Sequence, residues 1–216
     1  MKSEIQTKII DFIRRNKVST TEVADCLGKT GALKGIYPIN RGHFKVGRVK
    51  WVYAYDNSNY PVHEQIIDTQ EGDIVFIEAF DCGDRAIIGD LVSKYLLLYR
   101  QSQAIICNSY FRDAADLIKE NYPIWCKGFN PVGCFNVRPS YDFPEDKKKE
   151  HAEKYEGSIA VCDDCGVVII PKDEINHNFY QRLIAIEEQE DIWYDRLDHF
   201  KENTFEIVCL KKYLLE

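Results

Sequence analysis

The chain has 216 residues, a length that gives one good-sized domain or at most two small ones. Hydrophobic residues make up 45% and charged residues 29% of it, which argues against a disordered protein. Lys and Arg number 28 against 35 Asp and Glu, a net charge of −7 that disfavours binding to nucleic acid or to an anionic membrane. No apolar run is long enough to span a membrane and no signal peptide is evident, so we expect a cytoplasmic protein.

The N-terminal half predicts helices followed by strands. Residues 3–15 place apolar side chains at helical spacing, and a second helix begins at Ser19, whose spacing to Glu22 fits a capping box. The next expected elements are a strand over 42–56, a short helix over 62–68, a buried strand over 73–80, a helix from about Gly89, a strand over 104–107, a helix over 113–121 and a strand over 123–126. This alternation predicts an α/β core with parallel strand pairs.

The C-terminal part predicts a hairpin and more helix. The charged segment 144–157 is interpreted as a loop or an exposed helix, 158–170 as a hairpin, 172–203 as largely helical and 205–210 as a last strand. We expect one compact domain over 1–216, with mixed sheets flanked by helices. Its parts would be N-terminal helices (1–35), the α/β core (40–143), a closing hairpin (158–171) and a C-terminal helical extension (172–216).

The eight cysteines are scattered, and most lie in apolar stretches where a free thiol acts as a small hydrophobic group. Cys162 and Cys165 form a lone CxxC with no second pair to complete a zinc site, so a structural role is favoured over a metal or redox role. Of the histidines, His63 is interpreted as a packed or capping residue.

Two strand-to-helix junctions are candidates for chemistry, because active sites of α/β sheets gather where strands end and helices begin. One begins at Gly89, and the other holds Arg112 and Asp113. Asp116 lies one helical turn after Asp113, so both carboxylates could hold Mg2+ while Arg112 offers a cationic group to an anion. The alternative is that these aspartates cap a helix and pair with the arginine, and spacing alone favours that alternative.

Several segments resemble, in order, one known family. They are VSTTEVADCLGKTGALKGIYPIN, GDIVFIEAF, DRAIIGDLVSK, FRDAADLIKENYPIWCKGFNPVG and GSIAVCDDCGVVIIP. The family comprises the regulator of ribonuclease activity A and the 4-hydroxy-4-methyl-2-oxoglutarate / 4-carboxy-4-hydroxy-2-oxoadipate aldolases. The resemblance implies a swivelling β/β/α fold, assembled as a homotrimer or a pair of trimers with sites at subunit edges.

The resemblance also implies a metal-dependent lyase that cleaves or decarboxylates a 2-oxo acid through a pyruvate-type enolate. In the family's aldolases an Arg-Asp pair is followed three positions later by an acid that the pure regulators lack, and Arg112, Asp113 and Asp116 match this motif. By resemblance, Asp113 would bind Mg2+ or Mn2+, Asp116 would hold a metal-bound water, and Arg112 would stabilise the enolate.

The first junction receives substrate roles from the same resemblance. The backbone N–H groups of Leu91 and Val92, which follow Gly89, would bind the substrate carboxylate, and Asp90 would position the water that takes the alcohol proton. No nucleic acid or membrane partner is expected.

Some positions depart from the family pattern and keep two alternatives open. Tyr110 and Phe111 precede the Arg-Asp pair and could narrow or reshape the pocket, and Cys165 stands where an Asp is common. The C-terminal region, which includes Trp193, is longer than typical and could lend residues to a neighbouring subunit. The alternatives are an enzyme acting on a different small molecule and a non-catalytic regulator that binds a protein; the sequence leaves the physiological substrate open.

Overall fold

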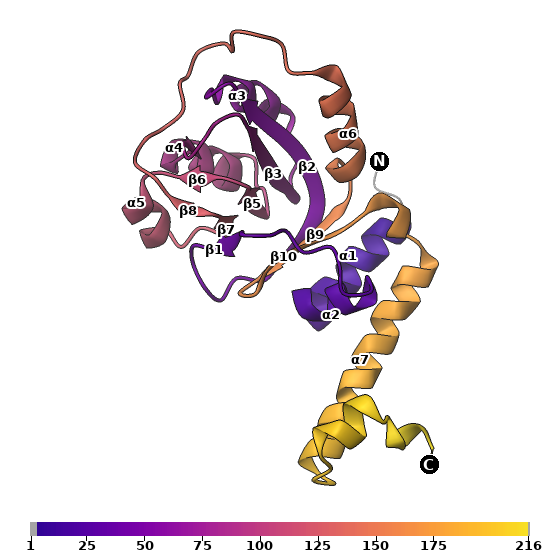
Figure 1. Cartoon of the computed structure of the whole chain (residues 1–216). Helices are drawn as coiled ribbons and strands as arrows, with labels where there is room; N and C mark the ends of the chain where they lie inside the picture. The colour runs from indigo at the N-terminus through magenta and orange to yellow at the C-terminus, as the bar shows by residue number, and fades with distance from the viewer. Residues whose placement is uncertain (1–3, 216) are drawn as a thin grey trace.

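A seven-stranded mixed sheet runs through the computed structural model, which describes residues 4–215 (Figure 1). Its order is β1-β7-β5-β3-β2-β9-β10. The strands are β1 (Tyr37–Pro38), β2 (Lys45–Tyr55), β3 (Asp73–Phe80), β5 (Ala104–Cys107), β7 (Ile124–Cys126), β9 (Ile159–Asp163) and β10 (Gly166–Ile170). The β2, β3, β5 and β7 neighbours pair in parallel and β9 with β10 forms an antiparallel hairpin, so both predictions are confirmed.

A second, parallel sheet of three short strands lies against one face of the large sheet. It consists of β4 (Ala86–Ile88), β6 (Tyr110–Phe111) and β8 (Gly128–Phe129). Each of these strands comes shortly after a strand of the large sheet, namely β3, β5 and β7. The chain therefore passes repeatedly from the large sheet to the small one and then into a helix or loop, which gathers successive junctions at one edge of the small sheet.

The central strands are apolar on both faces because each face packs against a separate core. On β3, Val75 and Ile77 belong to the core beneath the small sheet, whereas Ile74 and Phe76 belong to the core on the opposite face. Successive side chains of a strand point to opposite faces, so a continuous apolar run is what a sheet covered on both sides requires.

Helices cover both faces of the large sheet and one end of it. They are α1 (Glu4–Asn16), α2 (Thr20–Cys26), α3 (Tyr60–Gln65) with η1 (Ile66–Asp68), α4 (Asp90–Lys94) with the π-helical turn η2 (Tyr95–Tyr99), α5 (Ala114–Lys119), α6 (Glu145–Tyr155), η3 (Lys172–Glu174), α7 (His177–Asp198), η4 (Phe205–Cys209) and η5 (Lys212–Leu214). The predicted capping box is present: Ser19 Oγ accepts the N–H of Glu22, whose side chain accepts the N–H of Ser19.

The strand predicted over 205–210 is wrong. This segment forms the helical turn η4, which begins where Asn203 Oδ1 accepts the backbone N–H of Glu206 at 3.0 Å. The C-terminal extension runs away from the sheets along α7 (Figure 1), so β-branched residues here have no strand edge to pair with. Ile207 is buried in this arrangement, while Phe205 stays exposed.

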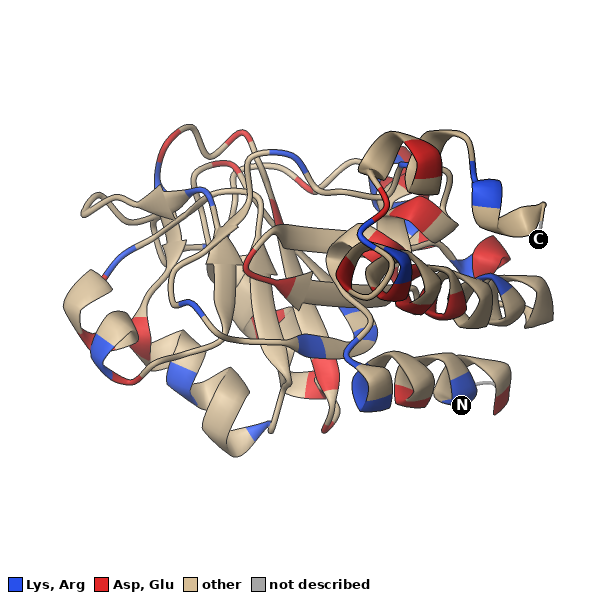
Figure 2. Ribbon diagram, turned by 90° about the horizontal axis from the view of Figure 1, so that it is seen from below, with Lys and Arg blue, Asp and Glu red and all other residues tan. Residues whose placement is uncertain are grey.

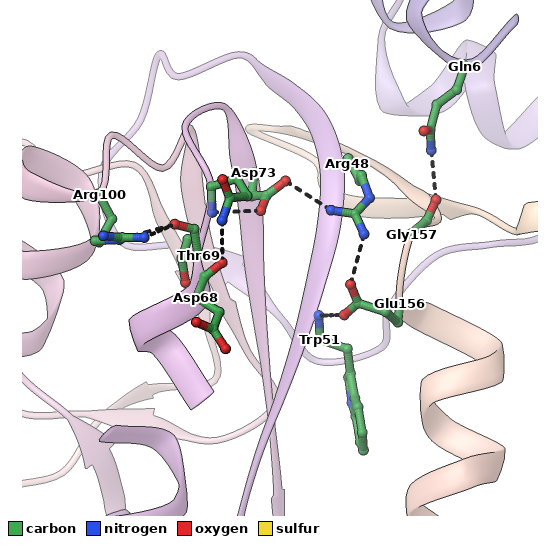
Figure 3. Close-up of polar contacts among 10 residues, drawn as sticks. Gln6, Arg48, Trp51, Asp68, Thr69, Asp73, Arg100, Glu156 and Gly157 are labelled. Atoms are coloured by element: carbon green, nitrogen blue, oxygen red, sulfur yellow. Dashed lines mark hydrogen bonds and ion pairs between the residues drawn. The ribbon is translucent and has the colours of Figure 1, made fainter. Parts of the chain in front are cut away.

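A polar network joins α1, the central strands and the end of α6 (Figure 3). Arg48 lies 3.6 Å from the buried Asp73 and 3.0 Å from Glu156, whose other oxygen accepts the backbone N–H of Trp51 at 2.7 Å. Gln6 donates to the carbonyl of Gly157 at 2.7 Å. These contacts fix α6 on the sheet face opposite the small sheet.

Charges of both signs are interspersed over the ribbon (Figure 2). Among residues 4–215 no helix is both long and apolar enough to cross a membrane.

Candidate active site

A small cavity of about 80 Å³ lies at the edge where β4 and β6 end, beside α3 and α4. Five residues predicted for the site line it together: Gly89, Leu91, Val92, Arg112 and Asp113. Asp90 and Asp116 were also predicted, but they are not among the residues that line the cavity. The other polar residues of its wall are Asn59, His63, Cys134 and Asn136.

The parallel pairing of β4 with β6 brings the two junctions together. The backbone N–H of Arg112 donates to the carbonyl of Ile88 at 3.1 Å, so the Arg112-Asp113 junction lies directly beside Gly89. Because parallel strands end at the same edge of a sheet, residues 23 or 24 positions apart in the sequence become neighbours here.

Asp113 stands at the N-cap position of α5, yet its side chain does not cap that helix. Instead Oδ2 accepts the backbone N–H of Asp90, at the start of α4, at 3.0 Å. The residue has φ +59°, a left-handed conformation of the kind that costs about 1–3 kcal/mol outside glycine and clusters at functional sites. The simple capping interpretation is therefore wrong for this carboxylate.

Arg112 and Asp113 are neighbours without a close ion pair. Arg112 Nε lies 3.7 Å from Asp113 Oδ2, beyond hydrogen-bonding distance, and the two side chains are 51% and 41% exposed. Both groups line the cavity and remain accessible, so the cation and the carboxylate can each bind a ligand.

Two glycines leave space for the side chains of Arg112 and Asp113 to lie close to the backbone at Gly89 and Gly133. A Cβ on Gly89 would lie 2.1 Å from Asp113 Oδ2 and 2.8 Å from Arg112 Cγ, and a Cβ on Gly133 would lie 2.8 Å from Arg112 Nη1. The φ of Gly89 is −141°, so any residue could adopt its backbone and the reason for glycine is space.

Asn59 and His63 were not predicted for the site. Asn59 is 8% exposed; its Nδ2 donates to the carbonyl of Ile87 at 2.9 Å, whereas its buried Oδ1 has no partner in the described protein. His63 is exposed and lines the cavity, so its interpretation as a packed residue is wrong, although it does lie in the last turn of α3. An Asn before a short helix is too common a pattern to have marked this position.

The expected narrowing of the pocket by Tyr110 and Phe111 is also wrong. Phe111 is fully buried beneath the small sheet, Tyr110 is half-buried, and neither lines the cavity. In the distant hairpin, Cys162 is buried and Cys165 is exposed, so the two thiols of the CxxC occupy different environments.

A thiol in the cavity wall is held in its neutral form. A side-chain hydrogen bond between Cys134 and Cys82, together with burial, raises the pKa of Cys134 well above its ordinary value. A neutral thiol is a poor nucleophile, so covalent catalysis by Cys134 is disfavoured.

The oxygen donors fit an open site for a hard cation. In the part of the chain that the structure describes, no group of three or more His, Cys, Asp or Glu residues is arranged to hold a metal. Asp113 and Asn59 both line the cavity, and the buried Oδ1 of Asn59 has no hydrogen-bond partner among the described residues. Mg2+ usually takes only one or two carboxylates and fills its shell with water and substrate, so this donor set suits it better than zinc.

The RraA-like family model, described as Aldolase/RraA, matches residues 20–169. The chain belongs to this family. A candidate 4-hydroxy-4-methyl-2-oxoglutarate aldolase of Halalkalibacterium halodurans is 27% identical over 186 residues, covering 76% of this chain and 79% of that protein.

Solved structures show the same fold as this RraA-like protein. An uncharacterized protein from Pseudomonas syringae pv. tomato superposes with a TM-score of 0.70 at 19% identity, covering 93% of this chain and 96% of that one. Streptomyces coelicolor RraAS2, an unusual member of the RNase ES inhibitor RraA family, gives 0.68 at 20% identity, covering 86% and 96%. The expected mixed α/β fold is confirmed.

Proposed function

We propose that this RraA-like protein is a divalent-metal-dependent lyase that cleaves or decarboxylates a 2-oxo acid. The observation that carries the proposal is the Asp113 carboxylate, which is diverted from capping its own helix and lines a cavity beside Arg112. The relationship to a candidate 2-oxo acid aldolase supports the same class of reaction.

In this proposal Arg112, the start of α4 and Asp90 each have a separate role in the reaction. Arg112 balances the negative charge that the pyruvate-type enolate acquires as the bond to the departing group breaks. The N–H groups of Leu91 and Val92 receive the substrate carboxylate, because the first N–H groups of α4 have no acceptor within the helix. Asp90, whose own N–H orients Asp113, positions the water that takes the alcohol proton in the aldol reaction.

Asp113 would hold Mg2+ or Mn2+, and Asp116 would act on it through a bound water. The ion would supply positive charge at the carboxylate and keto oxygens of the substrate. Asp116 is exposed, and its backbone N–H donates to the Asp113 carbonyl at 3.1 Å, so it is close in the chain but separate from the cavity wall. The proposal includes a homotrimer or a pair of trimers as the assembled form, which light scattering of the purified protein would test.

The decisive experiment measures pyruvate release from oxaloacetate and from 4-hydroxy-4-methyl-2-oxoglutarate, with Mg2+, with Mn2+ and with a chelator. We expect metal-dependent release by the wild type and none by Asp113→Ala. Asp146→Ala, an exposed acid on α6, is the matched control and should keep full activity. Full, chelator-sensitive turnover by Asp113→Ala would show that the site is assigned to the wrong residue.

A second candidate function is the binding of a protein partner as a regulator. The observation that favours it is the apolar surface of the C-terminal extension, where large side chains are exposed: Tyr194, Phe200, Phe205, Leu210 and Leu214. Exposed apolar patches of this kind mark interaction surfaces. A regulator would keep its partner affinity in Asp113→Ala, whereas a lyase would lose its activity.

A further inference from the structure

A second and larger cavity of about 530 Å³ adjoins the small one. The two cavities share three lining residues: His63, Leu91 and Val92. The small cavity, at about 80 Å³, is well below the roughly 300–1,000 Å³ of sites that enclose a whole ligand, whereas the large one falls within that range. A substrate whose 2-oxo acid end lies between Arg112 and Asp113 must therefore place its remaining atoms outside the small cavity.

Two helical segments build the walls of the larger cavity. From α3 and η1 come His63, Ile66 and Ile67, which share one helical face at spacings of three and four residues. From α4 and η2 come Leu91, Val92, Lys94, Tyr95 and Tyr99.

The second wall contains an irregular turn. The backbone N–H of Arg100 donates to the carbonyl of Tyr95 at 3.0 Å, five residues back, which makes η2 a π-turn. A π-turn accommodates one residue more than an α-turn and occurs often at functional sites. The π-turn ends at Tyr99, which is one of the residues that line the larger cavity.

The lining of the larger cavity is mainly apolar. Six of its eight lining residues are aliphatic or aromatic, and the other two are His63 and Lys94, so no carboxylate lines it. Leu91, Tyr99 and Ile67 are 80%, 72% and 60% exposed. Covering such side chains with an apolar group is favourable because it removes apolar surface from water.

We propose that the larger cavity binds the departing half of the substrate and that this half is an aliphatic or aromatic group without a carboxylate. The inference rests on the proposed lyase function and narrows its substrate class to 4-hydroxy-2-oxo acids with an apolar substituent at C4. In the cleavage the C3–C4 bond breaks and its electron pair passes to the pyruvate fragment. The C4 hydroxyl loses its proton and becomes the carbonyl of an apolar aldehyde or ketone, and the pyruvate enolate takes up a proton at C3.

The test compares three substrates by pyruvate release in the presence of Mg2+. They are 4-hydroxy-4-phenyl-2-oxobutanoate, 4-hydroxy-4-methyl-2-oxoglutarate and oxaloacetate, which has no group long enough to need the larger cavity. We expect kcat/KM for the phenyl compound to exceed that for the dicarboxylate by about 10-fold or more. Ile67→Asp should lower kcat/KM for the phenyl compound about 10-fold more than it lowers kcat/KM for oxaloacetate.

Leu98→Asp is the matched control, because Leu98 is 53% exposed on η2 but does not line the cavity. It should leave the ratio between the two substrates unaltered. A higher kcat/KM for the dicarboxylate than for the phenyl compound would overturn the inference. So would an equal fall in kcat/KM for the phenyl compound and for oxaloacetate in Ile67→Asp. In either case, turnover of oxaloacetate by the wild type would still support the lyase assignment. Dissociation of an oligomer by Ile67→Asp would also overturn it, by showing that a second copy covers the cavity. If the wild type released no pyruvate from any of the three substrates, the lyase assignment itself would be overturned.

Discussion

Asp113 and Asp90 are joined by a hydrogen bond in which a side chain at the start of one helix accepts the backbone N–H at the start of another. The Oδ2–N distance is 3.0 Å, and Asp113 adopts φ +59° to make the contact. A carboxylate that gives up its ordinary capping role and accepts a strained backbone costs stability, which is common where a residue serves a ligand.

Two substitutions of Asp113 should separate this strain from function. Asp113→Gly relieves the left-handed conformation, so we expect a Tm no lower than that of the wild type together with loss of activity. Asp113→Asn keeps the shape but removes the charge, and it should lower kcat/KM about 100-fold or more. Differential scanning calorimetry and the pyruvate assay measure the two effects. A large fall in Tm for Asp113→Gly would show that the aspartate is structural.

Gly89→Ala should inactivate the protein by crowding the site. The added Cβ would lie 2.1 Å from Asp113 Oδ2, so the carboxylate must move, at a cost of about 1–3 kcal/mol. Gly47→Ala is the matched control, since its Cβ would meet the Gly72 carbonyl at 2.7 Å and neither glycine lines the cavity. We expect similar losses in the free energy of unfolding for both variants and loss of activity only for Gly89→Ala. Equal activity of the two variants would contradict the proposed role of this close approach.

Much of the fold was predictable because its signals are local. The capping box at Ser19 needs only four consecutive residues. The buried strand over 73–80 is indicated by its continuous apolar run, which is required because each of its faces packs against a core. The prediction of a strand over 205–210 was wrong because strand formation depends on residues that are distant in the sequence. Strand propensity there has no neighbouring edge to satisfy it, and the position of an edge depends on the whole fold.

The residues predicted for the candidate site lie at two strand-to-helix junctions, whereas those supplied by other segments were missed. Arg112 and Asp113 are consecutive, and the resemblance marked them. Asn59, His63 and Gly133 come from other segments, and the sequence around each looks like an ordinary turn or helix start. Phe111 shows a further limit, since the alternation of strand residues directs its side chain into the core, and it does not line the cavity.

Asn59→Asp should weaken substrate binding. The substitution puts a second negative charge into a cavity that we expect to bind an anion, and the Ile87 carbonyl loses the donor that now lies at 2.9 Å. We expect KM for the 2-oxo acid to rise about 10-fold and the free energy of unfolding to fall by about 1–3 kcal/mol.

A second buried asparagine provides the control for that change. Asn40 is 9% exposed and its Nδ2 donates to the carbonyls of Leu117 and Tyr122 at 3.1 and 3.0 Å, away from the cavity lining. Asn40→Asp should be destabilised to a similar degree while its KM stays at the wild-type value. An unchanged KM in Asn59→Asp would mean that the substrate does not approach Asn59.

Asp116→Asn should affect metal affinity rather than chemistry. Because Asp116 does not line the cavity, its proposed effect on the ion passes through a water, and such indirect ligands typically change affinity about 10–100-fold. We expect the Mg2+ concentration for half-maximal activity to rise by that factor, with kcat at saturating Mg2+ largely restored. Glu120→Gln, an exposed acid at the end of the same helix, should behave as the wild type. Loss of kcat at every Mg2+ concentration would assign Asp116 a direct role.

The stability of the α2–α7 contact should depend on pH through Glu187. Burial, a hydrogen bond to Glu22 and the charges of Glu22, Asp191 and Glu190 raise the pKa of Glu187 from its ordinary 4.5 to about 7. Between these two values the folded state binds more protons than the unfolded state, so the free energy of unfolding should fall as the pH rises from 4.5 to about 7.

Glu187→Gln removes this titration and should flatten the decline, by less than about 1 kcal/mol because the group is partly exposed. Urea unfolding of both proteins at pH 5, 6, 7 and 8 measures the difference. Glu188→Gln, an exposed neighbour on the same helix, should retain the wild-type slope. If Glu187→Gln followed the wild-type curve over the whole range, the raised pKa of Glu187 would not contribute to the pH dependence of the α2–α7 contact.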